Sequence, residues 1–155
     1  MKAFVRYWLP VICWMAVIFI GSTDLMSAPQ TSRIIGPLVR WLKPDVSPET
    51  IAQIQFFLRK AAHLTEYAVL AAVLWRALRG GTQFQWKMST FAAAVLLTCA
   101  LFAATDEFHQ SFVASRTASP IDVLIDVCGA LIALALCWTF AARRSNRKSA
   151  IANRE

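Results

Sequence analysis

The apolar residues of this chain fall into helix-length segments separated by shorter polar connections. Uncharged runs cover residues 7–23, 88–105 and 127–142, and a fourth apolar run, 61–75, is interrupted only by His63 and Glu66. A helix needs roughly 20 residues to cross about 30 Å of hydrocarbon. We therefore predict an all-α membrane protein with four transmembrane helices in a bundle. The predicted spans are approximately 4–20, 54–78, 88–106 and 121–142.

Local signals set the ends of these helices. Ser47 before Pro48 and Glu49 is typical of a helix start: a capping side chain, a ring that fits the first position, and an acid near the positive end of the dipole. The second helix should then end at the glycines at 80 and 81. It exceeds the hydrocarbon thickness, so its first turns should protrude or the helix should tilt. The third helix is predicted over 87–110, and Pro120 opens the fourth.

The connection between the first and second spans has a pattern of its own. Apolar residues recur there at helical spacing, and three basic residues accompany them. They are Ile34, Leu38, Val39 and Leu42, with Arg33, Arg40 and Lys43. Such a pattern is typical of a short amphipathic helix that lies in the membrane interface with its basic side chains toward the head groups.

Composition supports a membrane protein and narrows the partners. The chain is 57% hydrophobic and 16% charged, more apolar than an average soluble domain. The net charge of +7 does not indicate nucleic acid as a partner, because five of the sixteen basic residues fall in the predicted tail, 143–155, where a membrane surface explains them. The four cysteines lie inside apolar segments without CxxC spacing, so neither a disulfide framework nor a cysteine zinc site is indicated.

The distribution of lysine and arginine predicts the orientation. With both termini inside, ten basic residues fall on the cytoplasmic side and six on the other. Because cytoplasmic loops carry the excess of Lys and Arg, we predict both termini in the cytoplasm.

Polar and ionisable residues gather in three short clusters, each at one end of an apolar segment. The clusters are Arg59, Lys60, His63, Glu66 and Tyr67; Asp106, Glu107, His109 and Gln110; and Asp122 and Asp126, preceded by Arg116. An ionisable group at membrane depth costs about 2.5–3.5 kcal/mol by insertion scales, so it usually has a partner or a function. With the predicted topology, all three clusters lie at the outward face and form one polar site.

Three chemistries fit these residue types. A histidine flanked by carboxylates could act as general base, with Asp106 or Asp122 orienting its ring. Basic side chains could bind the phosphate or carboxylate of a lipid-linked ligand. A divalent cation would find enough nitrogen and oxygen ligands among the residues of the clusters, although no compact ligand motif is present and the identity of a metal stays open. These residues are His63, Glu66, Asp106, His109 and Asp126. The catalytic candidates are His63, Glu66, Asp106, Glu107 and Asp122, and the ligand-binding candidates are Arg59, Lys60, Tyr67, His109, Gln110, Arg116 and Asp126.

Two motifs carry a resemblance to a known family. These are RKAAHLTEYAVL over residues 59–70 and DEFHQSFVASRTASPIDVLIDVCG over residues 106–129, together with a first helix that ends near IFIGST. The chain resembles the VanZ-like family of small bacterial membrane proteins. The resemblance implies a cytoplasmic-membrane protein and a four-helix layout, in a family named for a member linked to teicoplanin resistance. It implies no defined reaction. The motif positions that it marks are His63, Glu66, Asp106, Glu107, Gln110, Arg116 and Asp122.

These observations predict a cell-envelope protein whose outward site binds, and as a further step modifies, a lipid-linked or anionic envelope component. Two alternatives stay open from the sequence. One is a transporter in which acids and histidines relay protons or ions. The other is a bundle whose polar end only fixes helix packing or recruits a membrane partner. Whether the chain is an enzyme, and whether it takes a cofactor, is left open.

Overall fold

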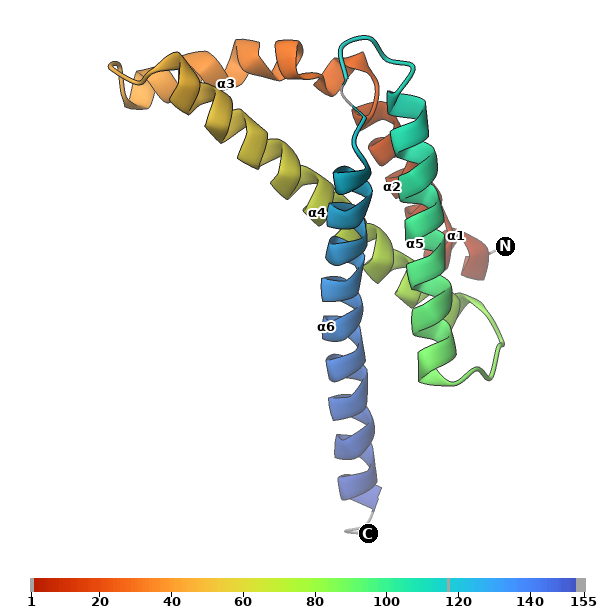
Figure 1. The fold of residues 1–155 in the computed structure, drawn as a ribbon. Coiled ribbons are helices and arrows are strands. Elements are labelled where there is room, and N and C mark those ends of the chain that lie inside the picture. The colour runs from red at the N-terminus through yellow and green to blue at the C-terminus, as the bar shows by residue number, and fades with distance from the viewer. Residues whose placement is uncertain (1, 117, 153–155) are drawn as a thin grey trace.

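The structure, a computed structural model, describes residues 2–116 and 118–152, with side chains as far as residue 143. Every regular element within these ranges is a helix. Figure 1 shows α5 and α6 running side by side, with α4 crossing them diagonally and α3 lying across one end. The elements are α1 (Lys2–Tyr7), α2 (Leu9–Gly21), the 3-10 helix η1 (Asp24–Met26), α3 (Ala28–Leu42), α4 (Pro48–Gly81), α5 (Met88–Gln110) and α6 (Pro120–Ala152).

The first predicted helix is interrupted near Pro10. Helix α1 ends at Tyr7 and α2 begins at Leu9, because proline has no N–H to donate to the carbonyl of Arg6 and its ring crowds that carbonyl. Arg76 of α4 donates from Nη2 to the free Arg6 carbonyl at 2.9 Å. The interruption is therefore compensated by a contact to the far end of α4.

The amphipathic segment predicted after the first span is a helix. Helix α3 has 15 residues, and together with η1 it makes an angle of 68° with α2. Ile34, Leu38 and Trp41 are exposed on it. The chain thus turns sharply after α2 and carries its apolar side chains across one end of the molecule (Figure 1).

Helix α4 begins and ends where the sequence predicts. The N–H of Thr50 donates to the Ser47 side chain at 3.3 Å, and the helix stops at Gly81. Its 34 residues span about 51 Å. Apart from Ile51, its buried residues all lie from Tyr67 onward. The second half of α4 is therefore part of the bundle, and the first half joins α3 in an arm that projects from it (Figure 1).

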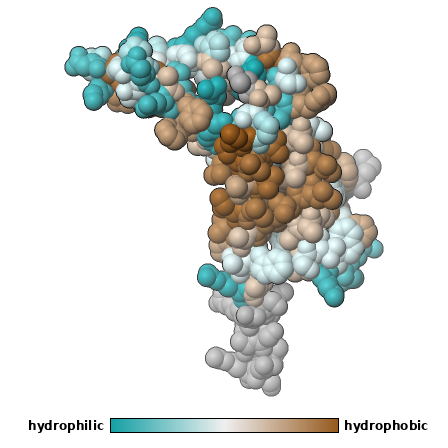
Figure 2. Space-filling view, in the orientation of Figure 1, coloured by the Kyte–Doolittle hydropathy of each residue, from teal (hydrophilic) through white to brown (hydrophobic). Residues whose placement is uncertain are grey.

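The core lies where α4, α5 and α6 pack together. It includes Leu70 and Leu74 of α4, Val95 of α5 and Ala130 of α6. A Cβ on Gly129 of α6 would overlap the backbone carbonyl of Leu64, so α4 and α6 cross with almost no side chain between them. Figure 2 shows a hydrophobic band across the middle of the molecule, with hydrophilic residues over the arm.

Helices α5 and α6 start as predicted, but α6 is longer than expected. It continues to Ala152 rather than ending near residue 142, because no glycine or proline follows Gly129 within it and Ala, Arg and Lys favour helix. The predicted tail is thus helical to residue 152. Residues 153–155, and the tail side chains beyond Arg143, lie outside the described part of the chain.

Two of the described helices are long and apolar enough to cross a membrane. They are α5 and the Pro120–Arg143 part of α6, and α2 with the segment up to Leu42 makes a third if that bent pair counts as one span. Helix α4 does not meet the same criterion, because His63, Glu66 and Arg76 interrupt its apolar run. The fold is therefore all-helical with two to three candidate spans.

Candidate functional site

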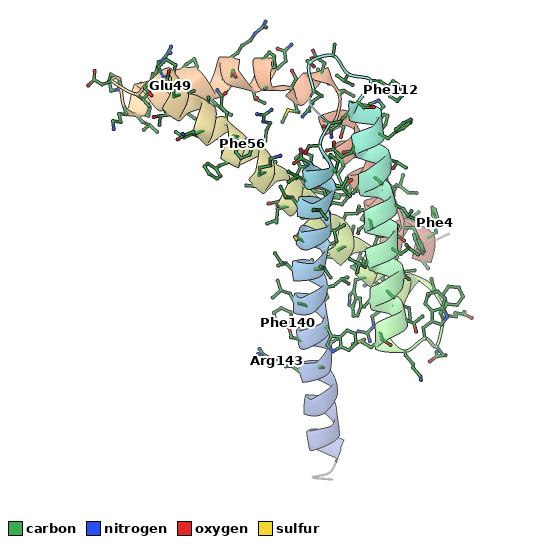
Figure 3. The ribbon with its side chains drawn as sticks, in the orientation of Figure 1. Phe4, Glu49, Phe56, Phe112, Phe140 and Arg143 are labelled. Carbon is green, nitrogen blue, oxygen red and sulfur yellow. The ribbon has the colours of Figure 1, made fainter. Side chains whose placement is uncertain are left out.

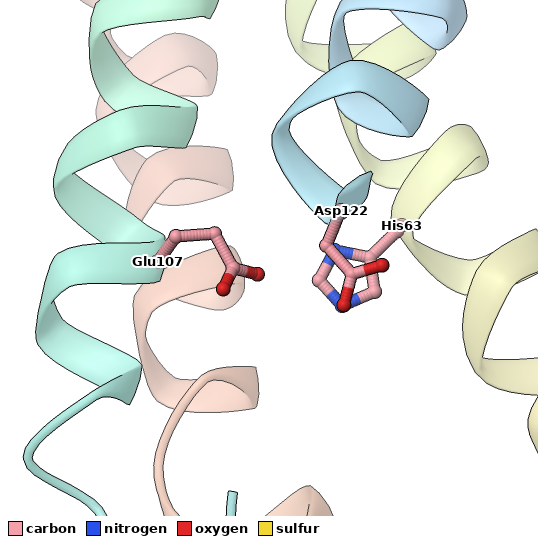
Figure 4. Close-up of side chains that lie close together, drawn as sticks. All are labelled: His63, Glu107 and Asp122. Carbon is pink, nitrogen blue, oxygen red and sulfur yellow. The ribbon is translucent and has the colours of Figure 1, made fainter. Parts of the chain in front are cut away.

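The three polar clusters of the sequence converge at the junction of α4, α5 and α6. Figure 4 shows Glu107 of α5 facing Asp122 of α6 and His63 of α4. One nitrogen or oxygen atom from each of these three residues lies within 4.8 Å of the other two. The expectation that helix ends far apart in the sequence share one face is confirmed for these residues.

The crossing of α4 and α6 pairs two side chains of each helix. The Nδ1 atom of His63 lies 3.1 Å from Oδ1 of Asp126, whose side chain is fully buried. One turn away, Lys60 forms an ion pair with Oδ1 of Asp122. Asp126 therefore orients the imidazole, where the sequence suggested Asp106 or Asp122. The close approach at Gly129 brings the two helices near enough for both pairs.

Among the described residues, one of the two carboxylate oxygens of Glu107 has a hydrogen-bond partner and the other has none. Its Oε2 accepts the backbone N–H of Ser119 at 2.8 Å. Its Oε1 is buried and has no hydrogen-bond partner among the described residues. Only 7% of the residue is exposed, and the carboxylate points toward Asp122 and His63 (Figure 4). This free, buried oxygen is unusual, because buried side-chain oxygens nearly always have a partner.

Asp106 belongs to a separate network between α2 and α5. The hydroxyl of Ser22 donates to Oδ1 of Asp106 at 2.5 Å, and the amide of Gln110 donates to Oδ2 at 3.1 Å. All three residues are buried. Both oxygens of this carboxylate are thus engaged, and the network fastens the end of α2 to α5.

Arg116 fastens the α5–α6 connection to the end of α2. Its Nε and Nη2 atoms donate to the carbonyl of Thr23 at 3.2 and 3.0 Å, and Nη2 also donates to the carbonyl of Gly21. A guanidinium is favourable there, because the last carbonyls of a helix lack partners and carry partial negative charge. Partial burial and the neighbouring Arg59 lower the pKa of Arg116, although an arginine stays protonated at neutral pH.

Two cavities adjoin this junction. The first, which we name the amphiphilic cavity, has a volume of about 420 Å³ and lies between α2, α3 and α4. Apolar side chains such as Val17, Ile35 and Leu58 line it together with Arg59 and Glu66. The second, the polar cavity, has a volume of about 310 Å³. The residues that line it are Phe56, Arg59, Lys60, His63, Gln110, Arg116, Ser119, Ile121 and Asp122.

Four residues line both cavities, which places a polar seam between them. They are Arg59, His63, Gln110 and Arg116. Two of the four are guanidinium groups that repel each other, which favours an anion between them. An amphiphile could therefore place its apolar part in one cavity and its charged group at the seam.

Other candidate residues lie away from the cavities. Tyr67 has no exposed surface, its hydroxyl has no partner among the described residues, and its ring lies 6.2 Å from that of Phe102. The ring centroid of His109 lies 4.6 Å from that of Phe19, and His109 lines neither cavity. Asp126 contacts His63 from inside the bundle. The structure thus places Tyr67 and His109 in packing positions.

Sequence analysis missed Ser22, Gln55 and Ser119. Ser119 precedes Pro120 just as Ser47 precedes Pro48, so the same helix-start pattern could have singled it out. Gln55 lines the amphiphilic cavity one turn before Arg59, and its Oε1 accepts from the hydroxyl of Ser32 at 3.0 Å. Ser22 lies near the end of the first uncharged run, in the IFIGST segment, and nothing in the sequence indicated its contact with Asp106.

The fold and the site define a class: a small, all-helical membrane protein with a polar, partly enclosed site at one end of its apolar helices. The family profile of VanZ/LLP1 matches residues 7–141. The chain therefore belongs to the VanZ/LLP1 family, as its motifs predicted. No protein of curated function and no solved structure matches the chain.

Proposed function

We propose that the chain is a four-span protein of the bacterial cytoplasmic membrane, with both termini in the cytoplasm. The second half of α4 supports a fourth span, because its buried residues pack against α5 and α6, which are apolar enough to cross the bilayer. Helices α1 and α2 pack against α4, and the amphipathic α3 then lies in the interface. Reporter fusions at residues 45 and 84 test this: the first should report the outside and the second the cytoplasm.

We further propose that the outward site binds a lipid-linked or anionic component of the cell envelope. The amphiphilic cavity supports this most strongly, since one wall is apolar and the seam carries Arg59 and Arg116. Guanidinium groups suit the oxygens of a phosphate or carboxylate. The exposed apolar side chains of α3, such as Trp41, and of the first half of α4, such as Phe56 (labelled in Figure 3), would contact lipid beside the two cavities.

Modification of the bound group would involve His63. Its ring lines both cavities while Nδ1 faces Asp126, which leaves Nε2 to take or give a proton. Glu66 lines the amphiphilic cavity and is the second acid or base within reach. In this proposal Asp106 and Gln110 position the seam by joining α2 to α5.

Native mass spectrometry tests the binding. Purified protein is mixed with a polyprenyl monophosphate, and separately with the polyprenyl alcohol of the same length. We expect a one-to-one complex with the phosphate only, weakened at least tenfold in Arg59→Gln. Arg33→Gln, a charge change at an exposed site on α3, is the matched control and should bind like the parent. Equal binding of alcohol and phosphate, or equal binding by the two variants, would overturn the proposal.

A non-catalytic role in helix packing is the second candidate, and the Ser22–Asp106–Gln110 network favours it. In that case, the amount of lipid complex formed by the alanine double variant His63→Ala, Glu66→Ala would fall only in proportion to the membrane level of the variant. Under the binding proposal, the same variant at unchanged level loses the lipid complex. Immunoblotting of membranes beside the mass spectra separates the two functions.

A further inference from the structure

We propose that His63, Glu107 and Asp122 form a binding site for one divalent transition-metal cation, of which Zn²⁺ and Mn²⁺ are the best-suited. The first observation is the meeting of one imidazole and two carboxylates, from three different helices, with atoms within 4.8 Å of one another. An imidazole with carboxylates suits these cations better than Mg²⁺ or Ca²⁺, which prefer oxygen alone.

The second observation is that each of the three side chains has one atom engaged and another left for the site. Nδ1 of His63 faces Asp126, Oε2 of Glu107 accepts from Ser119, and Oδ1 of Asp122 pairs with Lys60. This leaves Nε2 of His63, Oε1 of Glu107 and Oδ2 of Asp122. While the cation is bound, Nε2 does not take or give a proton, and Glu66, which lines the amphiphilic cavity, is the acid or base that remains.

Metal-binding histidines commonly donate their other ring N–H to a carboxylate, and ligating carboxylates are hydrogen-bonded in turn. The contact between His63 and buried Asp126 fits that arrangement, and so does the backbone N–H that holds Glu107. His63 and Glu107 are therefore oriented by contacts to the atoms that would not bind the metal, as metal ligands usually are.

The third observation is the buried, unpartnered Oε1 of Glu107, which belongs to a carboxylate that points toward the other two residues (Figure 4). A cation would satisfy it and would balance the two carboxylates. Bonds of about 2.0–2.2 Å bring ligand atoms to roughly 3–3.5 Å from one another, so binding needs an inward movement of at most about 1 Å by each of the three side chains.

The polar cavity leaves room for a further ligand. His63 and Asp122 line it together with Arg59 and Arg116, so an oxygen atom can approach the cation from that side. A cation with three protein ligands and an open position resembles catalytic rather than structural sites. That the open position takes the charged oxygen of an envelope lipid rests on the proposed function, but the cation site itself does not.

The test uses the whole 155-residue chain in detergent micelles, with any affinity tag removed, treated with EDTA and then desalted. ZnCl₂ or MnCl₂ is added, and the metal that stays with the protein after gel filtration is measured by mass spectrometry. We expect one ion per chain and a higher melting temperature with metal, because a ligand of the folded state stabilises that state. Glu107→Gln keeps an oxygen that can accept from the Ser119 N–H. It should weaken metal binding at least tenfold and abolish the rise in melting temperature with metal.

Glu49→Gln is the matched control, since Glu49 is an exposed glutamate at the outer end of the arm (Figure 3). It should bind metal like the parent. If the metal-free Glu107→Gln variant has a different melting temperature from the parent, Asp122→Asn is used in its place. The same loss of metal binding, at least tenfold, is expected. Stoichiometric binding that both cluster variants retain, or no stoichiometric binding by the parent, would overturn the site. Lipid binding is measured separately in EDTA, so that failure of the cation site and failure of the lipid proposal are told apart.

Discussion

Two neighbouring acids on α5 have opposite surroundings. Asp106 lies between Ser22 and Gln110, and both of its oxygens accept hydrogen bonds. In Glu107, the next residue, one oxygen accepts from Ser119 and the other has no described partner, and the carboxylate faces His63 and Asp122. A fully paired buried acid is explained by the packing that it stabilises, whereas an unpaired one is not. The comparison divides the polar residues into a closed network at α2–α5 and an open cluster at α4–α5–α6.

The largest expected effect comes from separating α4 and α6, which should disrupt the open cluster before the closed network. Gly129→Val places side-chain atoms against the backbone of Leu64, which cannot move without the whole helix. We expect a loss of about 3 kcal/mol or more in the free energy of unfolding, at the upper end of overpacking effects. Thermal unfolding in detergent measures it. Ala135→Val, on an exposed part of α6, is the control, and equal melting of the two variants would contradict the assigned crossing.

The closed network should respond mainly in stability. Ser22→Ala removes the hydroxyl that donates to Asp106 and should cost about 1–2 kcal/mol, because a buried carboxylate oxygen loses its partner. Metal binding should stay within twofold of the parent once the protein is folded, because Ser22 does not contact the open cluster of His63, Glu107 and Asp122. Ser111→Ala, at an exposed serine, should change stability by less than about 0.5 kcal/mol. A selective loss of metal binding in Ser22→Ala would move Asp106 into the open cluster.

The sequence predicted most element boundaries because their causes are local. Ser47 and Pro48 begin α4, Gly81 ends it, and Pro120 begins α6, each through the backbone chemistry of one or two residues. The meeting of His63, Glu107 and Asp122, one residue from each cluster, also followed, since antiparallel helices bring alternate helix ends to one end of a bundle. The break near Pro10 was not predicted, since the first span was expected to be continuous over 4–20. The carbonyl of Arg6 accepts from Arg76, and that contact could not be predicted because Arg76 lies 70 residues away in the chain.

The pairing of side chains could not be predicted, because it depends on how the helices cross. Gly129 lets α6 approach Leu64, and that approach sets Asp126 rather than Asp122 against Nδ1 of His63. The metal-binding set suggested by composition was His63, Glu66, Asp106, His109 and Asp126, and of these the structure puts only His63 in the open cluster. Arg116 was predicted to bind a ligand. In the structure it donates hydrogen bonds to carbonyls at the end of α2, and these bonds depend on a loop conformation that has no sequence signature.

Arg116 links the α5–α6 connection to the end of α2, and its substitution should have a smaller effect on the free energy of unfolding. Arg116→Lys keeps the charge but loses the forked contact with the carbonyls of Gly21 and Thr23, at a cost of about 1 kcal/mol. Amide hydrogen exchange in residues 111–116 should become faster. Arg33→Lys, on the exposed surface of α3, should leave that exchange unchanged. Identical exchange in the two variants would show that the connection is held by other contacts.

The smallest effect on stability is expected from Lys60. Its ion pair with Asp122 is partly exposed, so Lys60→Gln should change the free energy of unfolding by less than about 1 kcal/mol. The same change removes a positive charge beside the open cluster, and Zn²⁺ affinity should rise severalfold. Arg40→Gln, an exposed charge change on α3, should alter neither quantity. Weaker zinc binding in Lys60→Gln would mean that Lys60 mainly positions Asp122.

The most direct test of the comparison is a paired measurement on Asp106→Asn and Glu107→Gln, recording the melting temperature without metal and the affinity for Zn²⁺. The account predicts that Asp106→Asn melts lower and binds zinc like the parent, while Glu107→Gln melts like the parent and binds zinc at least tenfold more weakly. If both variants change in the same way, or if the roles are exchanged, the division into a closed network and an open cluster is wrong.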